Sequence, residues 1–142
     1  TYCIDSTNDD IRYQRNRIRH RIIPELESIN PNVVDAIARL GGSVSEDLAV
    51  ISDLTVQAFK RLVTIDKGEM RLSRRALRKE PLAIQRRLWQ RLVSSIDSDI
   101  TLTTAHQEQL LDIVNTGEAK TFTIKSIKVI AQCDTIKVYC KH

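Results

Sequence analysis

An arginine cluster near the start of the chain is the group of side chains best suited to chemistry. Five guanidinium groups fall within ten residues, and they are Arg12, Arg15, Arg17, Arg19 and Arg21. Like charges one helical turn apart repel each other, so folding alone does not favour this arrangement. Guanidinium groups form paired hydrogen bonds with phosphate oxygens. The cluster therefore predicts contact with a phosphate-bearing partner.

A second basic segment covers residues 71–91, where eight lysine and arginine side chains accompany a single acid, Glu80. The net charge is +5 over residues 12–21 and +7 over residues 71–91, which leaves −8 for the rest of a chain whose total is +4. Such segregation is typical of an electrostatic footprint for an acidic partner. The plain alternative is that residues 71–91 form an ordinary solvated helix face.

The other reactive residue types indicate little chemistry. Cys3, Cys133 and Cys140 form an odd set without a paired spacing, which argues against a disulfide framework or a zinc site and favours the reducing cytoplasm. His20 and His106 lack a partner at metal-ligand or triad spacing. No apolar stretch approaches the roughly 18 residues that a membrane helix needs. We therefore expect no metal site, no nucleophilic cysteine and no membrane partner.

A helix is needed to present the arginine cluster. Residues 5–8 are turn-forming and capping types, and Asp9 or Asp10 suits the positive end of a helix dipole. A narrow apolar stripe, flanked by arginines on both sides, is formed along this helix by Ile11, Ile18 and Ile22. Pro24 is expected to end or kink the helix.

The body of the chain has mainly helical periodicity. An apolar seam predicts one long helix over about residues 32–63, in which Gly41-Gly42 marks a bend, a break or a close-packing site. Shorter helices are expected over residues 73–79, 81–96 and 104–115, with Ser73 as the N-cap of the first and Gly117 as the C-cap of the last. Alternating patterns predict strands over residues 70–72, 121–125, 127–131 and 135–140.

The predicted fold class is therefore mainly α, with a bundle-like helical domain and a small C-terminal antiparallel β-sheet. The helix over residues 81–96 should bury a set of apolar residues that starts at Leu82. The last strand should likewise turn Cys140 inward, together with Ile136 and Val138.

The opening segment resembles the end of the catalytic domain in tRNA(Ile)-lysidine synthases. The residues that carry the resemblance, in order and at family-like spacing, are Asp5-Ser6-Thr7-Asn8, Tyr13, Arg15-Asn16-Arg17-Ile18-Arg19 and Pro24-Glu25-Leu26. A linker helix, a helical domain and trailing strands also match the layout of that family. The resemblance implies that residues 1–30 are the end of a catalytic domain with its linker helix. It implies that residues 31–142 are a helical accessory domain with terminal β-strands.

The resemblance also implies a reaction. The family uses ATP and Mg to adenylate the wobble cytidine of tRNA(Ile), and lysine then displaces AMP to give lysidine. Its ATP site is a glycine-rich PP-loop, and no glycine of this sequence has that setting. The chain would then be a piece of a ligase that positions tRNA. It would need a PP-loop domain encoded upstream, bind no cofactor itself and be inactive alone.

Roles carried over from the family fall into three groups. The residues expected to face the active site are Arg15, Asn16 and Arg19. The residues expected to fix the turn and helix geometry are Asp5, Asn8, Tyr13 and Pro24. Plain helix capping is the alternative for Asp5, Ser6 and Asn8. The candidate contacts to tRNA backbone phosphates are Arg12, Arg17, Arg74, Arg78, Arg87 and Arg91. For the first group the alternative is an ion-pair network with Asp9, Asp10 or Glu25.

Two other functions fit the same sequence. One is a stand-alone helical nucleic-acid-binding module without catalysis, and a start codon next to Thr1 would favour it over the ligase. The other is a helical interaction protein whose apolar seam pairs with a partner helix. Salt-insensitive binding to tRNA would favour that reading, because phosphate contacts weaken steeply with ionic strength. The oligomeric state and any domain after His142 are left open.

Overall fold

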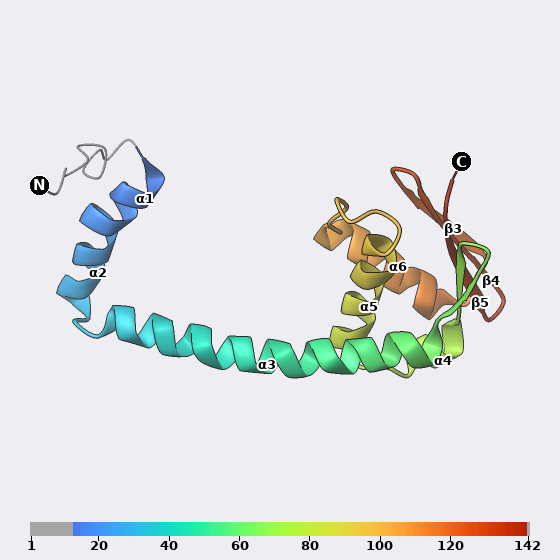
Figure 1. Cartoon of the computed structure of the whole chain (residues 1–142), viewed down its shortest axis with the longest axis horizontal. Helices are drawn as coiled ribbons and strands as arrows, with labels where there is room; N and C mark the ends of the chain where they lie inside the picture. Colours follow the sequence, from blue (N-terminus) through green and yellow to red (C-terminus); the bar gives the residue numbers. More distant parts are fainter. Residues whose placement is uncertain (1–12, 142) are drawn as a thin grey trace, which may run out of the picture. The chain divides into compact units, whose positions relative to one another are not determined.

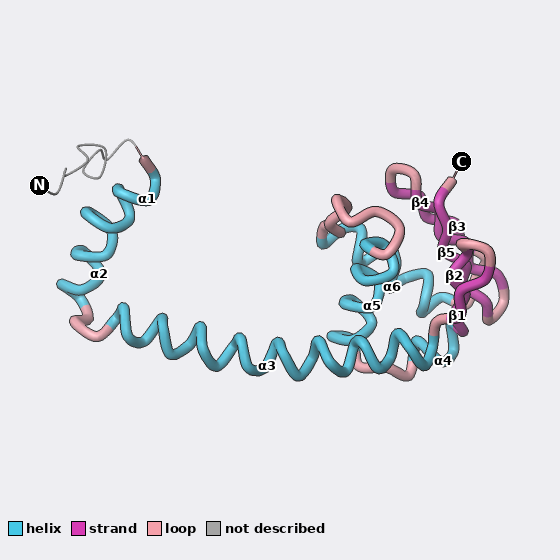
Figure 2. The backbone as a smooth tube through the Cα atoms, in the orientation of Figure 1, coloured by secondary structure: helices cyan, strands magenta, loops and turns pink. Residues whose placement is uncertain are grey.

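The computed structural model describes residues 13–141 (Figures 1 and 2). The predictions for Asp5, Asn8 and Arg12, and for a helix start at Asp9 or Asp10, lie outside the described residues. The chain divides into two compact units, Thr1–Asp47 and Leu48–His142, and the helix α3 (Val33–Leu62) belongs to both. The boundary predicted after residue 30 coincides with the turn that precedes α3, and it stays a prediction.

The first unit contains one continuous helical segment ahead of α3. It begins as α1 (Gln14–Arg17), widens into the π-helical turn η2 (Ile18–Ile22) and continues as α2 (Ile23–Ile29). Of the two outcomes expected at Pro24, an end of the helix is wrong, because Pro24 lies in the first turn of α2 and the helix continues to Ile29; a kink at Pro24 stays a prediction. Proline lacks a backbone hydrogen-bond donor, and its ring crowds the preceding helical turn. The wider π-helical turn η2 is that preceding turn.

The apolar stripe expected along this segment is not buried. Ile11 lies outside the described residues. Ile18 and Ile22 are each exposed by about two-fifths within the part of the chain that the structure describes, as is Leu26 one turn further on. Neither the α1–α2 segment nor η2 buries any described residue. The predicted stripe therefore exists as a pattern of residue types without a packing partner among residues 13–141.

The helix α3 is unbroken over 30 residues, which corresponds to a length of about 45 Å. A Cβ added to Gly41 or Gly42 would meet no atom within 4 Å, so these glycines mark neither a break nor a close-packing site among the described residues. The apolar seam is buried only toward the C-terminal end, at Thr55 and Ala58. Toward the N-terminal end Leu40 is 65% exposed.

The second unit combines three helices and a five-stranded sheet with the end of α3. In chain order its elements are β1 (Thr64–Asp66), β2 (Glu69–Ser73), α4 (Arg74–Arg78), α5 (Leu82–Ser94), α6 (Thr104–Thr116), β3 (Lys120–Ile124), β4 (Ile127–Gln132) and β5 (Thr135–Cys140). The strands are antiparallel and follow the spatial order β1-β2-β5-β4-β3. The predicted fold class is confirmed.

One face of the sheet and the helices share a single hydrophobic core. A cross-strand row of apolar residues is formed on that face by Met70, Val138, Val129 and Phe122. These side chains belong to the same buried cluster as Trp89, Leu92 and Val114 from α5 and α6. Complete burial of such side chains is the main stabilising contribution in a domain of this size.

Two predicted core residues are exposed, and two predicted caps are confirmed. Leu82 is the first residue of α5 and Cys140 is the last of β5, so each lies where its element leaves the core. The Ser73 hydroxyl accepts a hydrogen bond from the backbone nitrogen of Ala76 at the start of α4. Gly117 follows α6 with a φ of +74°, a left-handed conformation that suits glycine.

Candidate nucleic-acid interface

The arginine cluster of the first unit lies on the surface of α1 and η2. Within the described part of the cluster, every side chain is exposed and none forms an ion pair with Glu25 or another described carboxylate; these are Arg15, Arg17, Arg19 and Arg21. Arg15 and Arg19 flank the junction where the backbone changes from the α to the π pattern. Four solvated guanidinium groups on two turns form a surface that attracts anions.

The other predicted residues of this segment, Tyr13, Asn16 and Pro24, lie at helix starts or contact neighbouring residues. Tyr13 is the N-cap residue of α1 but makes no side-chain capping hydrogen bond, and its ring is exposed. Asn16 is half-buried and has an interaction partner of its own. Pro24 occupies the first turn of α2. Active-site-facing roles for Arg15, Asn16 and Arg19 stay predictions.

The basic segment 71–91 is not one surface, because the fold distributes its side chains over three places. Arg71 in β2 hydrogen-bonds Glu69, which also contacts Lys137 of β5 at 3.6 Å. These two cations lower the pKa of the Glu69 carboxyl, chiefly through the hydrogen bond from Arg71, and the same bond raises the pKa of Arg71. Arg71 is thus partly neutralised within the sheet.

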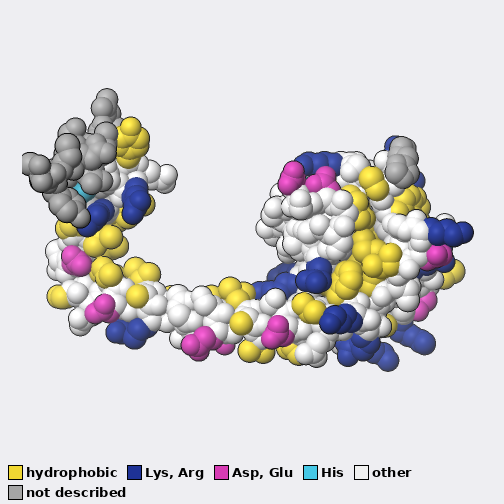
Figure 3. Space-filling view, in the orientation of Figure 1, with side chains coloured by type: hydrophobic (Ala, Val, Ile, Leu, Met, Phe, Trp, Pro, Cys, Tyr) yellow, Lys and Arg dark blue, Asp and Glu magenta, His cyan; other side chains and the backbone are white. Residues whose placement is uncertain are grey.

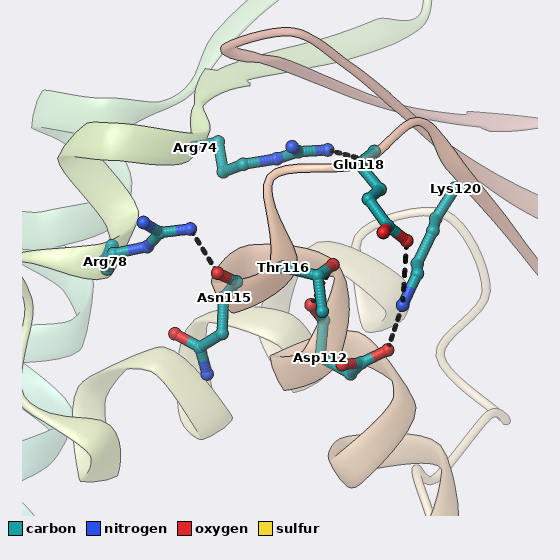
Figure 4. A network of polar contacts seen from close by, with 7 residues as sticks. All are labelled: Arg74, Arg78, Asp112, Asn115, Thr116, Glu118 and Lys120. Atoms are coloured by element: carbon teal, nitrogen blue, oxygen red, sulfur yellow. Dashed lines mark hydrogen bonds and ion pairs between the residues drawn. The ribbon is translucent and has the colours of Figure 1, made fainter.

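Arg74 and Arg78 of α4 reach the end of α6, as Figure 4 shows. Arg74 is only 3% exposed, and its Nη2 donates to the Glu118 carbonyl at 2.6 Å. Arg78 donates from Nη2 to the carbonyls of Val114 and Asn115, each at 2.6 Å. Carbonyls at a helix end lack partners inside the helix, so Arg78 stabilises the end of α6, whereas Arg74 holds the segment that follows it. Arg74 was a candidate for contact with tRNA phosphates, but its side chain is buried and does not lie on the surface.

Arg87 and Arg91 lie one turn apart on α5 and line a groove against α3. The groove has a volume of about 420 Å³ and no acidic residue in its walls, which are formed by Leu48, Ser52, Thr55, Arg87, Gln90, Arg91 and Ser94. Hydroxyl, amide and guanidinium groups all donate hydrogen bonds to phosphate oxygens. Figure 3 shows lysines and arginines gathered along this stretch of the second unit.

Local contacts hold the walls of this groove in place. The guanidinium carbon of Arg91 lies 5.3 Å from the centre of the Phe59 ring, a cation–π contact that ties α5 to α3. The Gln90 side chain donates to the Ile100 carbonyl and the Ser94 hydroxyl, both at 2.9 Å, and accepts from the Leu102 nitrogen at 2.8 Å. The groove therefore has a fixed floor with two long cationic side chains at its edge.

Sequence reasoning identified the two arginines of the groove but not its other walls. Ser52, Thr55 and Phe59 recur at three- and four-residue spacing, so one face of α3 carries all three. That spacing was a usable signal, but nothing in the sequence indicated that this face meets Arg87 and Arg91, which lie far along the chain.

None of the four glycines lies in a loop that leads from a strand into a helix. Gly41 and Gly42 lie inside α3, Gly68 lies in the β1–β2 turn and Gly117 follows α6, so none forms a phosphate-cradling loop between a strand and a helix. Within residues 13–141 there is also no group of three or more histidine, cysteine, aspartate or glutamate side chains placed to hold a metal ion. None of the described helices has the length and apolar character needed to cross a bilayer.

No protein-family model matches the chain. Curated proteins do match it, and several carry one name. The chain is 33% identical over 97 residues to the tRNA(Ile)-lysidine synthase of Geobacter sulfurreducens, and 33% identical over 108 residues to that of Nostoc sp.. It is 48% identical over 58 residues to that of Thermotoga sp.. The chain is related to the tRNA(Ile)-lysidine synthases.

Two of these matches cover about two thirds of this chain, and all three cover a minor part of each relative. The aligned segments span 68% of this chain and 21% of the Geobacter lysidine synthase, and 67% of this chain and 32% of the Nostoc one. The Thermotoga alignment spans 41% of this chain and 14% of that synthase. The family resemblance carried by the opening motif is thus confirmed, and it concerns a limited stretch of the lysidine synthases.

Proposed function

We propose that this chain is part of a tRNA(Ile)-lysidine synthase and holds tRNA(Ile) for modification elsewhere in the same enzyme. The relatives carry that name, and the groove lined by Arg87 and Arg91 is the observation that supports an RNA-binding role most directly. Its walls carry positive charge and hydrogen-bond donors without an opposing carboxylate. Contacts of this kind position a nucleic acid without reading its sequence.

The complete enzyme, in this proposal, is a cytoplasmic ligase that adenylates the wobble cytidine with ATP and Mg and then joins lysine to it. A PP-loop domain would supply the ATP site. The exposed cluster on α1 and η2 would face that domain's active site through Arg15, Asn16 and Arg19. Arg12 and Arg17 would contact tRNA. The present chain, whose glycines form no phosphate-cradling loop, would bind tRNA but form no lysidine alone.

Charge reversal in the groove tests the proposal. The double variant R87E/R91E should weaken tRNA affinity by roughly tenfold or more, because two phosphate contacts become repulsive. The affinity is measured by fluorescence anisotropy with labelled tRNA(Ile) at fixed ionic strength. Circular dichroism verifies that the variant keeps its helices.

A matched control carries the same change of charge outside the groove. Lys79 and Arg86 are exposed and do not line the groove, so K79E/R86E should weaken binding much less than R87E/R91E. Equal losses of tRNA affinity in the two double variants would show that net charge alone explains the effect. An unchanged affinity in R87E/R91E would remove the groove from the RNA interface.

A second candidate function has its own supporting observation. The N-terminal part of the α3 seam exposes Ile37, Leu40 and Val44, and an amphipathic helix of this kind suits a helical interaction protein. The two candidates differ in their response to salt, since apolar helix pairing does not weaken as ionic strength rises.

A further inference from the structure

A small cavity lies beside α4, at the β4–β5 turn and the residue that follows α6. It has a volume of about 290 Å³, and the residues around it are Arg74, Arg75, Arg78, Gly117, Cys133 and Asp134. The cavity is separate from the groove between α3 and α5, with which it shares no residue. Its lining thus contains three arginines and one aspartate.

Arg74 is a buried cation without a buried anion. Its Nη2 bonds the Glu118 carbonyl, but Nε and Nη1 have no hydrogen-bond partner in the described structure. No ion pair joins Arg74 to a carboxylate of residues 13–141. Burying a charged group is costly unless an opposite charge and hydrogen bonds compensate it. This side chain therefore indicates that an anion belongs close to it.

The Asp134 carboxylate is already engaged with α4. Its Oδ2 accepts a hydrogen bond from the Ser73 hydroxyl at 2.6 Å, and its Oδ1 accepts one from the Arg75 backbone nitrogen at 2.7 Å. The carboxylate thus holds the start of α4. Its single negative charge balances one of the three positive charges of Arg74, Arg75 and Arg78. The Arg75 guanidinium makes no hydrogen bond or ion pair with a described residue, although its charge acts on the Asp134 carboxylate. Nη1 of Arg78 takes no part in the bonds to α6.

Gly117 lies beside Arg74 in the lining of the cavity. A Cβ at this position would lie 4.0 Å from Nη1 of Arg74, an ordinary contact distance. The left-handed φ of Gly117 is what favours glycine here.

We propose that this cavity binds a phosphate group. Arg75 and Arg78 hold its oxygens directly, and Arg74 supplies positive charge from its buried position. A phosphate has several strong acceptor oxygens and a charge that matches the excess of guanidinium groups. The group comes either from the backbone of a bound RNA or from free phosphate. The RNA source rests on the proposed function, whereas the phosphate site does not.

Cys133 offers a matched pair of variants that test the site without touching an arginine. Cys133 lines the cavity with a φ of +49°, a conformation that asparagine and aspartate tolerate. C133D places a carboxylate beside the three arginines, and C133N places a neutral side chain of the same shape there. The experiment follows thermal unfolding of the 142-residue chain in phosphate and in chloride at equal ionic strength.

The wild type and C133N should show a rise in Tm that saturates with millimolar phosphate, as expected for a ligand bound only by the folded state. C133D should have a higher Tm in chloride and lose the response to phosphate. Equal phosphate responses in C133D and C133N, or no response in the wild type, would overturn the site.

Titration with tRNA(Ile) then separates the two sources. Weaker tRNA binding by C133D than by C133N assigns the phosphate to the RNA backbone, and equal binding assigns it to free phosphate. A wild-type chain that responds to phosphate but binds no tRNA would contradict the proposed function and leave the site standing.

Discussion

Asp134 connects two elements that are far apart in the sequence. It lies in the β4–β5 turn, and its carboxylate accepts hydrogen bonds from Ser73 and from the backbone of Arg75 at the start of α4. The Ser73 hydrogen bond, followed by that from the Arg75 backbone, lowers the pKa of the Asp134 carboxyl below its ordinary value. A lowered pKa in the folded state means that ionised Asp134 stabilises the fold.

The variant D134N should therefore unfold more easily than the wild type at neutral pH. The contribution of Asp134 is present above the carboxyl's unfolded pKa, roughly 3.9, and is lost as the pH falls through the lower pKa of the folded state. The stability difference between the two proteins should shrink over that acidic range. Urea unfolding at a series of pH values measures it, and a difference that stays constant down to acid pH would contradict the role given to Asp134.

Local chemistry made some single residues predictable and left others hidden. Ser73 and Gly117 were identified as caps because their side-chain types have strong local preferences at helix ends. The burial of Arg74 could not be predicted, since arginine is almost always exposed. Its place depends on the carbonyl of Glu118, 44 residues later in the chain.

At the scale of elements, α3 is the clearest case of a predicted helix with an unpredicted environment. Its span was expected at 32–63 and is Val33–Leu62, because a long apolar period specifies a helix reliably. The seam does not say which part is covered. Contacts across the sequence bury Thr55 and Ala58 but leave Ile37 and Leu40 exposed.

Replacing Gly41 or Gly42 by alanine should stabilise α3 by up to about 1 kcal/mol each, because glycine is a poor helix former. No described atom lies where the new methyl group would go. Hydrogen exchange of the backbone amides around residue 41 measures the change, and slower exchange is expected. Faster exchange in the alanine variants would show that the glycines are needed for close packing.

Two other elements show the limits of pattern reasoning. β1 was missed because it has only three residues, Thr64–Asp66, which is too short for an alternating pattern to be recognised, and no buried residue marks it. The π-helical turn η2 was missed because residue types around a proline do not specify how the backbone adjusts to it. In both cases backbone hydrogen bonding decided the structure.

At the scale of the whole chain, the fold turns a linear excess of charge into several distinct sites. Residues 71–91 contribute to the sheet through Arg71, to the end of α6 through Arg74 and Arg78, and to the groove through Arg87 and Arg91. The exposed arginine cluster on α1 and η2 lies outside this segment, near the start of the chain. Composition predicted an acidic partner, but only the fold shows which cations are committed to internal contacts.

The salt dependence of tRNA binding tests the central claim, which is that the exposed arginines meet RNA phosphates. The dissociation constant of the chain for tRNA(Ile) is measured over a range of salt concentrations. The affinity should fall steeply and linearly on logarithmic axes, and R87E/R91E should flatten the slope by about 0.9 for each phosphate that the variant no longer neutralises. An affinity that does not change with salt, or a slope identical in the wild type and the variant, would contradict the account.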